Sequence, residues 1–217
     1  RPRARRARPV ESAPMGIPPD RLLSVEEARA QILGALEPLP SDQVPLVEAA
    51  AIPEAFATAW LNLCVEAGMK AGDLVLIQAG ASGLGMAAIQ LAKALGARVL
   101  TTVGSQAKAD FVRGLGADLV VNHRTEELAV VMEQHPVDIA LDCVAGPSLG
   151  RCVERMARGG RWIVIATMGG ARSELDLNVF FRRGLRLLGS TLRSRPLEMK
   201  ERILADLEAR LWARFSS

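Results

Sequence analysis

Short apolar runs alternate with helical patterns from Gly72 to about residue 190. The runs are nearly continuous, as in Leu74–Ile77 and Ile163–Ile165, and do not alternate with polar residues. This pattern is typical of strands in a parallel sheet that is buried on both faces. The predicted strands are Leu74–Gln78, Arg98–Val103, Leu119–Asn122, Val137–Leu141, Gly160–Ala166 and Leu185–Gly189.

Stretches with helical spacing of apolar residues separate these runs. The helices are predicted at Leu84–Leu95, Gln106–Leu115, Thr125–Gln134, Pro147–Ala157 and Leu175–Arg183. Such alternation of strand and helix indicates consecutive right-handed crossovers. The predicted fold class is therefore α/β, a doubly wound parallel sheet of the Rossmann type, with only a remnant of any second domain.

The segments on either side of this core also have helical patterns. A capping box at residues 24–27 predicts a short helix from Ser24 to Leu36, and Pro53 suits the first position of a helix that reaches Ala67. We expect residues 1–35 to form an arm and short helix, residues 36–71 a hinge and helix, and residues 72–217 a dinucleotide-binding domain that is truncated at its C-terminus.

Residues 196–215 predict a last helix, because their apolar side chains recur at near-helical spacing. Its apolar residues are Leu197, Ile203, Leu204, Leu207, Leu211 and Phe215. We expect this face to pack on the chain's own sheet. The alternative is an interaction protein that binds a partner through this helix and the Arg-rich start of the chain.

The stretch after the first predicted strand gives the strongest chemical signal. A buried strand ends, a turn with the pattern Gly80-x-x-Gly83-x-Gly85 follows, and a helix begins. Gly80 allows a sharp turn, and the small Ala81 and Ser82 let backbone come close to a ligand. Gly83 and Gly85 let the backbone approach a pyrophosphate and let the helix pack tightly on the sheet. Amides at a helix start favour an anion, so this pattern predicts a dinucleotide site; the alternative is a tight turn that binds nothing.

The end of the second strand indicates which cofactor binds. NAD sites usually carry an acid about 20 residues past the glycines, for the ribose 2′-hydroxyl. In this chain no acid occurs there before Asp110. Ser105 can donate a hydrogen bond and Lys108 supplies positive charge, which suits a 2′-phosphate and favours NADP(H) over NAD(H). The same two residues also fit an ordinary helix cap and a solvated lysine.

Two later strand ends should face the same crevice, because ligands of open parallel sheets bind outside the carboxyl ends of the strands. These ends are residues 142–146 and 166–170, which are small or apolar apart from Asp142, Cys143 and Thr167. Asp142 can border the site or cap the next helix. Cys143 has no His or basic neighbour in sequence, so we interpret it as a packing residue and not as a nucleophile.

Composition excludes several chemistries. Of 217 residues 49% are hydrophobic and 24% are charged, which fits a packed globular protein. There is no Tyr, so the tyrosine-dependent chemistry of short-chain dehydrogenases is excluded. Two His and three widely separated Cys give no zinc-site spacing, and sparse thiols suit a reducing, cytoplasmic compartment. No apolar run approaches the roughly 18 residues of a membrane helix.

The net charge of +3 is unevenly distributed. Residues 1–9 hold five Arg and no acid, which leaves 22 basic against 24 acidic residues in the rest of the chain. A mildly acidic body is not typical of a nucleic-acid-binding protein, so we predict neither a nucleic-acid nor a membrane partner. The Arg-rich arm alone could contact either, or be a solvated terminus.

From about Leu36 to Ser217 the chain resembles the cofactor-binding half of the medium-chain dehydrogenases/reductases. Within that superfamily it is similar to the zinc-free quinone oxidoreductases of the tumour-suppressor-inducible branch. The matching stretches are residues 49–55, 78–85, 104–106, 141–144, 168–170 and 190–195. In that superfamily a β-rich substrate domain precedes the cofactor domain, and residues 1–35 do not resemble it. We therefore expect one domain and a hinge of a two-domain enzyme.

The resemblance implies NADPH-dependent transfer of hydride to a quinone or a related electron-poor carbonyl or enone, by a homodimer and without a metal. It assigns no catalytic residue. His123 matches a cofactor-contacting position where relatives often have Tyr, although an exposed loop histidine is equally compatible. The predicted cofactor-binding residues are Gly80, Ala81, Ser82, Gly83, Leu84, Gly85, Ser105, Lys108, His123, Val144, Met168 and Gly169. The alternative function is a truncated NADP(H)-binding module without efficient catalysis.

Overall fold

The computed structural model describes residues 54–215, with side chains as far as Leu211. All of them belong to one compact unit, Val44–Ser217. The helix predicted at Ser24–Leu36 lies outside the described residues.

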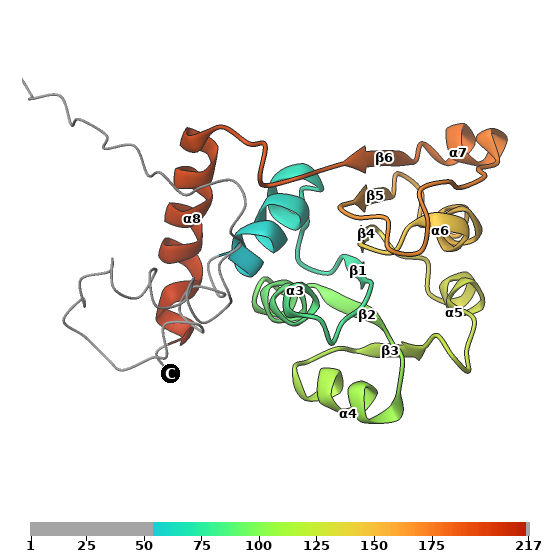
Figure 1. Ribbon diagram of the computed structural model, residues 1–217, viewed down its shortest axis with the longest axis horizontal. Coiled ribbons are helices and arrows are strands. Elements are labelled where there is room, and N and C mark those ends of the chain that lie inside the picture. Colours follow the sequence, from blue (N-terminus) through green and yellow to red (C-terminus); the bar gives the residue numbers. More distant parts are fainter. Residues whose placement is uncertain (1–53, 216–217) are drawn as a thin grey trace, which may run out of the picture. The chain divides into compact units, whose positions relative to one another are not determined.

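Six parallel strands form one sheet in the order β3-β2-β1-β4-β5-β6 (Figure 1). The strands are β1 (Leu74–Ile77), β2 (Arg98–Val103), β3 (Leu119–Asn122), β4 (Ile139–Asp142), β5 (Arg161–Val164) and β6 (Arg186–Gly189). In the register of the central strand, Val75 pairs with Val99 on one side and with Ile139 on the other. The doubly wound parallel sheet is confirmed, and every predicted strand is present within two residues of its expected ends.

The helices that connect and follow the strands also occupy the predicted stretches. They are α3 (Gly83–Ala94), α4 (Gln106–Gly114), α5 (Leu128–Gln134), α6 (Gly146–Val153), α7 (Leu177–Arg183) and α8 (Leu197–Phe215). The predicted end of α6 at Ala157 is wrong, because this helix ends at Val153. The predicted start of α5 at Thr125 is also wrong. The amides of Thr125 and Glu126 both donate to the carbonyl of Asn122, which makes a turn before the helix begins.

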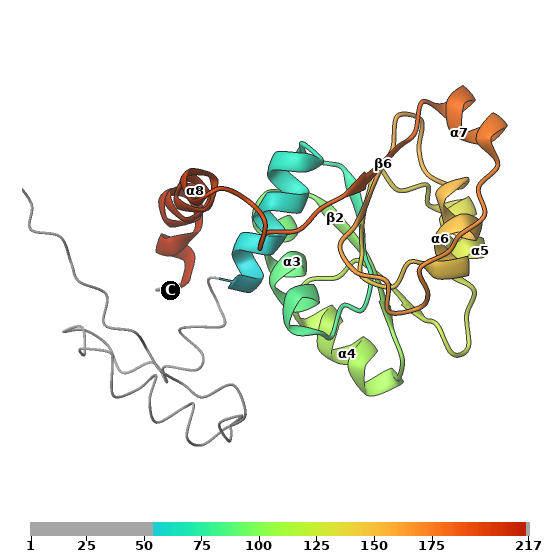
Figure 2. The same cartoon turned by 45° about the horizontal axis from the view of Figure 1, so that its top comes forward.

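Alternate strand residues contribute to two separate cores. Val75 and Ile77 pack with α3 on one face, whereas Leu74 and Leu76 pack with residues of α5 and α6 on the other. Figure 2 shows α3 and α4 on one side of the sheet and α5 and α6 on the opposite side. Burial of both faces explains the continuous apolar runs of the central strands β1 and β4, whereas the edge strand β6 is mostly exposed.

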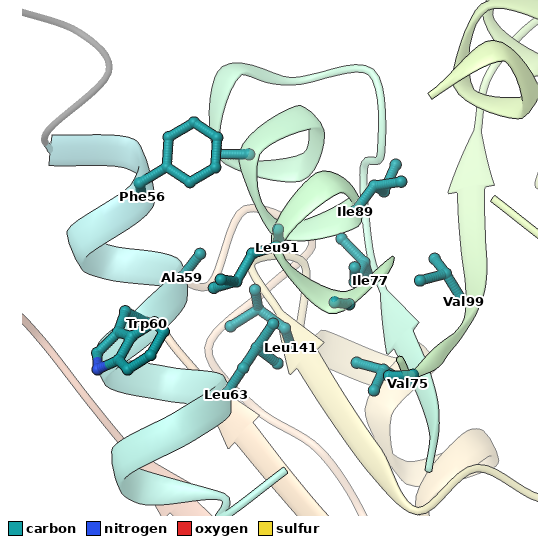
Figure 3. Packing of buried hydrophobic residues seen from close by; sticks show 14 of the residues in the cluster. Phe56, Ala59, Trp60, Leu63, Val75, Ile77, Ile89, Leu91, Val99 and Leu141 are labelled. Carbon is teal, nitrogen blue, oxygen red and sulfur yellow. The ribbon is translucent and has the colours of Figure 1, made fainter. Parts of the chain in front are cut away.

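The helix that precedes the sheet changes type along its length. Residues 54–60 are α-helical, and η1 (Leu61–Glu66) is a π-helix, in which the amide of Ala67 donates to the carbonyl of Asn62. Helix is therefore present as predicted over the described part, but the π-turn was not predicted. Phe56 and Leu63 point from this helix towards α3 and the sheet (Figure 3), and Trp60 is buried in the same core.

The last helix, α8, packs against this same core. Ile203, Leu207 and Leu211 are buried, whereas Leu197 and Leu204 are exposed. The helix therefore packs on the chain's own fold as far as Leu211, but it lies beside the helix of residues 54–66 and not on the sheet, where we expected it (Figures 1 and 2). Two polar contacts support it. Arg210 lies over the ring of Trp60, 5.5 Å from its centroid, and Arg195 Nη2 donates to Glu66 Oε1 at 2.5 Å.

This packing predicts unequal effects of two leucine truncations within α8. Leu207 is 7% exposed and Leu204 is 46% exposed. Leu207→Ala should lower the free energy of unfolding by about 2–5 kcal/mol, because it leaves a cavity in the core. Leu204→Ala should change it by roughly 0.5 kcal/mol or less. Urea unfolding followed by circular dichroism measures both, and equal small losses would show that α8 does not complete the core.

Candidate dinucleotide-binding site

A cleft of about 750 Å³ lies at the carboxyl ends of β1, β2, β3 and β4. Ser82 lines it after β1, Ser105 after β2, His123 after β3 and Val144 after β4. The chain leaves β1 towards β2 and later returns to β4 on the other side of β1. This is the switch point of the strand order, where the loops separate and ligands of doubly wound sheets bind.

The turn after β1 is held by Thr102 and crowded against β2. Ala79 has a left-handed backbone, with φ 55°, and its amide donates to Thr102 Oγ1 at 3.0 Å. A Cβ on Gly80 would lie 2.1 Å from Thr101 Oγ1, and one on Gly85 would lie 2.4 Å from the carbonyl oxygen of Ala79. Packing of the protein alone therefore requires glycine at positions 80 and 85.

Gly83 has no such steric reason. A Cβ added to it would meet no atom within 4 Å. Ser82 caps α3, and its Oγ accepts from the amide of Gly85 at 3.1 Å. Among residues 54–215 the amides of Gly83 and Leu84 have no hydrogen-bond acceptor. These amides lie at the positive end of a 12-residue helix, which is the arrangement that binds a diphosphate.

The ends of β2 and β3 meet over Gly104. A Cβ on Gly104 would lie 3.1 Å from His123 Nε2 and 3.7 Å from Arg124 Nε, so glycine leaves room for both side chains. Ser105 caps α4, and its Oγ accepts from the amide of Lys108 at 3.3 Å. The cap at Ser105 is thus present, and a ligand contact there remains a prediction.

Two arginines in the cleft were not predicted. Arg124 and Arg151 line it together with Lys108, and these three cations form no ion pair within the described part of the chain. Glu126 and Glu127 lie on the same wall, and Glu126 accepts from the amide of Asn122 at 2.9 Å. Arg124 directly follows β3, so the rule that ligands bind at strand ends would have found it. Arg151 comes from the last turn of α6 and has no such signal.

Asp142 does not line the cleft. It is fully buried, and its Oδ1 accepts from the amides of Val144 at 2.7 Å and Ala145 at 2.9 Å. Its Oδ2 accepts from Trp162 Nε1 at 2.8 Å. Of the two roles considered for it, bordering the site is wrong. As for the capping role, Asp142 binds two amides of the loop that precedes α6 and no amide of the first turn of that helix.

The loop after β5 lies against the loop after β4. The amide of Gly169 donates to the carbonyl of Val144 at 2.7 Å, and a Cβ on Gly169 would lie 2.8 Å from Val144 Cγ1. The Met168 side chain is 83% exposed. The structure therefore brings Val144 and Gly169 together and places Met168 outside the cleft.

Six of the predicted site residues line the cleft, namely Ala81, Ser82, Ser105, Lys108, His123 and Val144. Of the other six, Gly80 and Gly85 pack beneath the turn, and Gly83 and Leu84 begin α3. Met168 and Gly169 belong to the loop after β5.

Cys143 suits the packing role predicted for it. Burial raises the pKa of its thiol, and the neighbouring Asp142 carboxylate raises it further. A raised pKa disfavours the thiolate that a nucleophile requires.

A family model described as zinc-binding dehydrogenase matches residues 83–209, which is more than half of the chain. The chain therefore belongs to the zinc-binding dehydrogenase family. Within residues 54–215 no three His, Cys, Asp or Glu side chains lie close enough to hold a metal ion, so we assign no described residue to zinc. The expected absence of a metal stays a prediction. No helix in the described part is long and apolar enough to cross a membrane.

Similar curated proteins are polyketide synthases. A phenolphthiocerol/phthiocerol polyketide synthase of Mycobacterium tuberculosis is 38% identical over 120 residues, which are 54% of this chain and 6% of the synthase. A mycocerosic acid synthase-like polyketide synthase of Mycolicibacterium smegmatis is 36% identical over 143 residues, 64% of this chain and 7% of that protein. The chain thus spans a small part of these relatives.

Solved structures give the same family and a closer match in size. The nucleotide-binding subdomain of the enoylreductase domain of PpsC from Mycobacterium tuberculosis has a TM-score of 0.65 and 29% identity, covering 72% of this chain and 92% of that one. The quinone oxidoreductase of Thermus thermophilus has a TM-score of 0.69 and 32% identity, covering 84% and 58%. The expected superfamily is confirmed, whereas the narrower assignment to its quinone oxidoreductase branch is not.

The different roles of the glycines predict different effects of alanine. Gly80→Ala should lower the free energy of unfolding by about 1–3 kcal/mol, because its Cβ would overlap the Thr101 hydroxyl. Gly83→Ala should leave that free energy unchanged or raise it by up to about 1 kcal/mol, since the site is open and alanine restricts the unfolded chain. Guanidinium unfolding of both variants checks this, and a loss at Gly83 as large as at Gly80 would contradict it.

Proposed function

We propose that this chain binds NADP(H) and forms the cofactor-binding part of a reductase that delivers hydride to an α,β-unsaturated thioester. One observation carries the proposal. A single cleft joins Ser82, which caps α3 directly before its free amides, to the cations Lys108 and Arg124, which follow β2 and β3. That spacing of an anion-binding turn and a cationic corner suits a dinucleotide with a phosphate on its adenosine ribose. The Thermus thermophilus relative was solved with NADPH, which supports the same cofactor.

The chain's own residues fit this cofactor. The amides of Gly83 and Leu84 would bind the diphosphate, because they are free and lie at the positive end of α3. Lys108, Arg124 and the Ser105 hydroxyl would hold the 2′-phosphate by charge-assisted hydrogen bonds. His123 lies over Gly104 beside them and would contact the adenosine. The second nucleoside would then extend past β1 towards Val144 and Gly169.

The acceptor is proposed as an enoyl thioester because of the relatives. The similar curated proteins are polyketide synthases, and a similar solved structure belongs to an enoylreductase domain. Bound NADPH supplies the hydride, and a proton must reach the neighbouring carbon to complete the reduction. The residues described here contribute by binding and orienting the cofactor. We assign no proton donor among them. A quinone is the second candidate acceptor, which the Thermus thermophilus relative supports.

A binding module without efficient catalysis is the alternative function. The 83% exposure of Met168 favours it, since this side chain lies on the loop where the second nucleoside would end. If the site is open to solvent at this loop, water can reach the second nucleoside, whereas hydride transfer benefits from the exclusion of water.

The cationic corner predicts a preference for NADPH over NADH. Lys108→Ala or Arg124→Ala should raise the dissociation constant of NADPH about 10-fold or more, because each removes a charge-assisted contact to the 2′-phosphate. The constant for NADH should change by less than about two-fold, since NADH carries no phosphate there. Arg113→Ala is the control, because this residue lies at the other end of α4 and pairs with Asp110. Titration of reduced-nicotinamide fluorescence measures both dissociation constants for the unmodified chain and the three variants. Equal affinities of the unmodified chain for NADPH and NADH would refute the assignment of Lys108 and Arg124 to a 2′-phosphate.

The acceptor is tested by NADPH consumption in the presence of crotonyl-pantetheine, a small ortho-quinone or no acceptor. We expect oxidation of NADPH to depend on the protein and on the thioester, because an enoyl thioester is an electron-poor acceptor of hydride. Turnover with the quinone alone would favour the quinone oxidoreductase function. NADPH binding without turnover above background would leave the binding module as the function of the chain.

A further inference from the structure

Asp142 is a carboxylate with no access to solvent, at the end of β4. It accepts three hydrogen bonds, from the amides of Val144 and Ala145 and from the indole of Trp162. Burial of a charged group is costly unless hydrogen bonds satisfy it. The three donors satisfy both oxygens of the Asp142 carboxylate, and the same hydrogen bonds hold these donors in place.

The loop that Asp142 holds has an unfavourable backbone. Ala145 has φ 53° and ψ −136°, and the following Gly146 has φ 60°. A non-glycine residue in that region is strained and persists only where its surroundings enforce the conformation. The hydrogen bond from the Ala145 amide to Asp142 is a contact that enforces it here.

This loop in turn supports the loop after β5. The amides of Met168 and Gly169 donate to the carbonyls of Cys143 and Val144, at 3.1 and 2.7 Å. Trp162 belongs to β5, so the Asp142 carboxylate ties β4 and β5 together below the point where both loops leave the sheet. One buried group therefore sets the position of Val144 and, through Val144, of Gly169.

We propose that Asp142 is a positioning residue for the second nucleoside of the dinucleotide, the half that carries the reacting ring. This inference rests on the proposed function. In the sheet order, the cationic corner lies at β2 and β3 and the diphosphate turn lies at β1. The remaining nucleoside must continue to the other side of β1, over the ends of β4 and β5. There it meets the two loops that Asp142 fixes, although Asp142 itself does not reach the cleft.

The test compares a whole ligand with half of it. NADPH extends over both sides of β1, whereas 2′,5′-ADP ends at the cationic corner. Asp142→Asn keeps the size of the side chain, but an amide nitrogen beside the Trp162 indole cannot accept its hydrogen bond. In the full chain we expect the dissociation constant of NADPH to rise about 10-fold or more, and that of 2′,5′-ADP to change by less than about two-fold.

Asp138→Asn is the matched control. Asp138 directly precedes β4 and also accepts from a backbone amide, that of Leu74 at 2.9 Å. It lies at the amino ends of the strands, whereas the cleft lies at their carboxyl ends. The Asp138→Asn substitution should leave the ratio of the dissociation constants of NADPH and 2′,5′-ADP unchanged. If Asp142→Asn does not fold, Trp162→Phe removes one of the three donors, and we expect a smaller rise that is again confined to NADPH.

The outcomes separate this inference from the function on which it rests. Equal weakening of both ligands, or no weakening of either, would overturn the role of Asp142 and leave NADP(H) binding intact. The role of Asp142 would also be overturned if Asp138→Asn weakened the binding of NADPH and not that of 2′,5′-ADP, because the effect would then be general to the strand. Failure of the unmodified chain to bind either ligand would overturn both proposals.

Discussion

The position of β1 between β2 and β4 is the constraint on which the rest of the structure depends. All four residues of this strand are buried, and the cores on the two faces of the sheet both include them. Because its neighbours lead the chain away in opposite directions, the loops separate above its carboxyl end. The cleft, the free amides of α3 and the cationic corner are all consequences of that single arrangement. Its stability comes from apolar burial, and its chemistry comes from backbone amides in the first turn of α3, which have no intrahelical acceptor.

The glycines of the turn divide into two kinds when their surroundings are considered. Gly80 and Gly85 are required because neighbouring atoms of β2 and of the turn itself leave no space for a side chain. Gly83 is surrounded by open space, so the reason for glycine there must come from a ligand or from evolutionary chance. A glycine motif is thus partly a packing motif.

Local sequence determined most of the fold and only part of the site. Continuous apolar runs identified the six strands of the described sheet, although only β1 and β4 are buried along their whole length and the edge strand β6 is mostly exposed. The start of α5, the π-turn at η1 and the role of Asp142 could not be predicted in the same way. The role of Asp142 depends on atoms that meet only after folding, the Trp162 indole and the Asp142 carboxylate, which are 20 positions apart. The late start of α5 and the π-turn come instead from local hydrogen bonds that the spacing of apolar residues does not reveal. The rule that ligands bind at the carboxyl ends of strands, which we applied to β2, would also have found Arg124 after β3. Arg151 lines the cleft only because α6 packs beside it.

The pairing of the first described helix with the last has a consequence for where this protein can be divided. Trp60 and Leu63 share one core with Ile203, Leu207 and Leu211, and Arg195 joins Glu66 across 129 positions of the chain. A fragment cut to the six strands and their crossovers would expose that apolar surface to water. Any exchange of this cofactor unit between enzymes must therefore carry both flanking helices as a pair, with junctions placed outside residues 54 and 211.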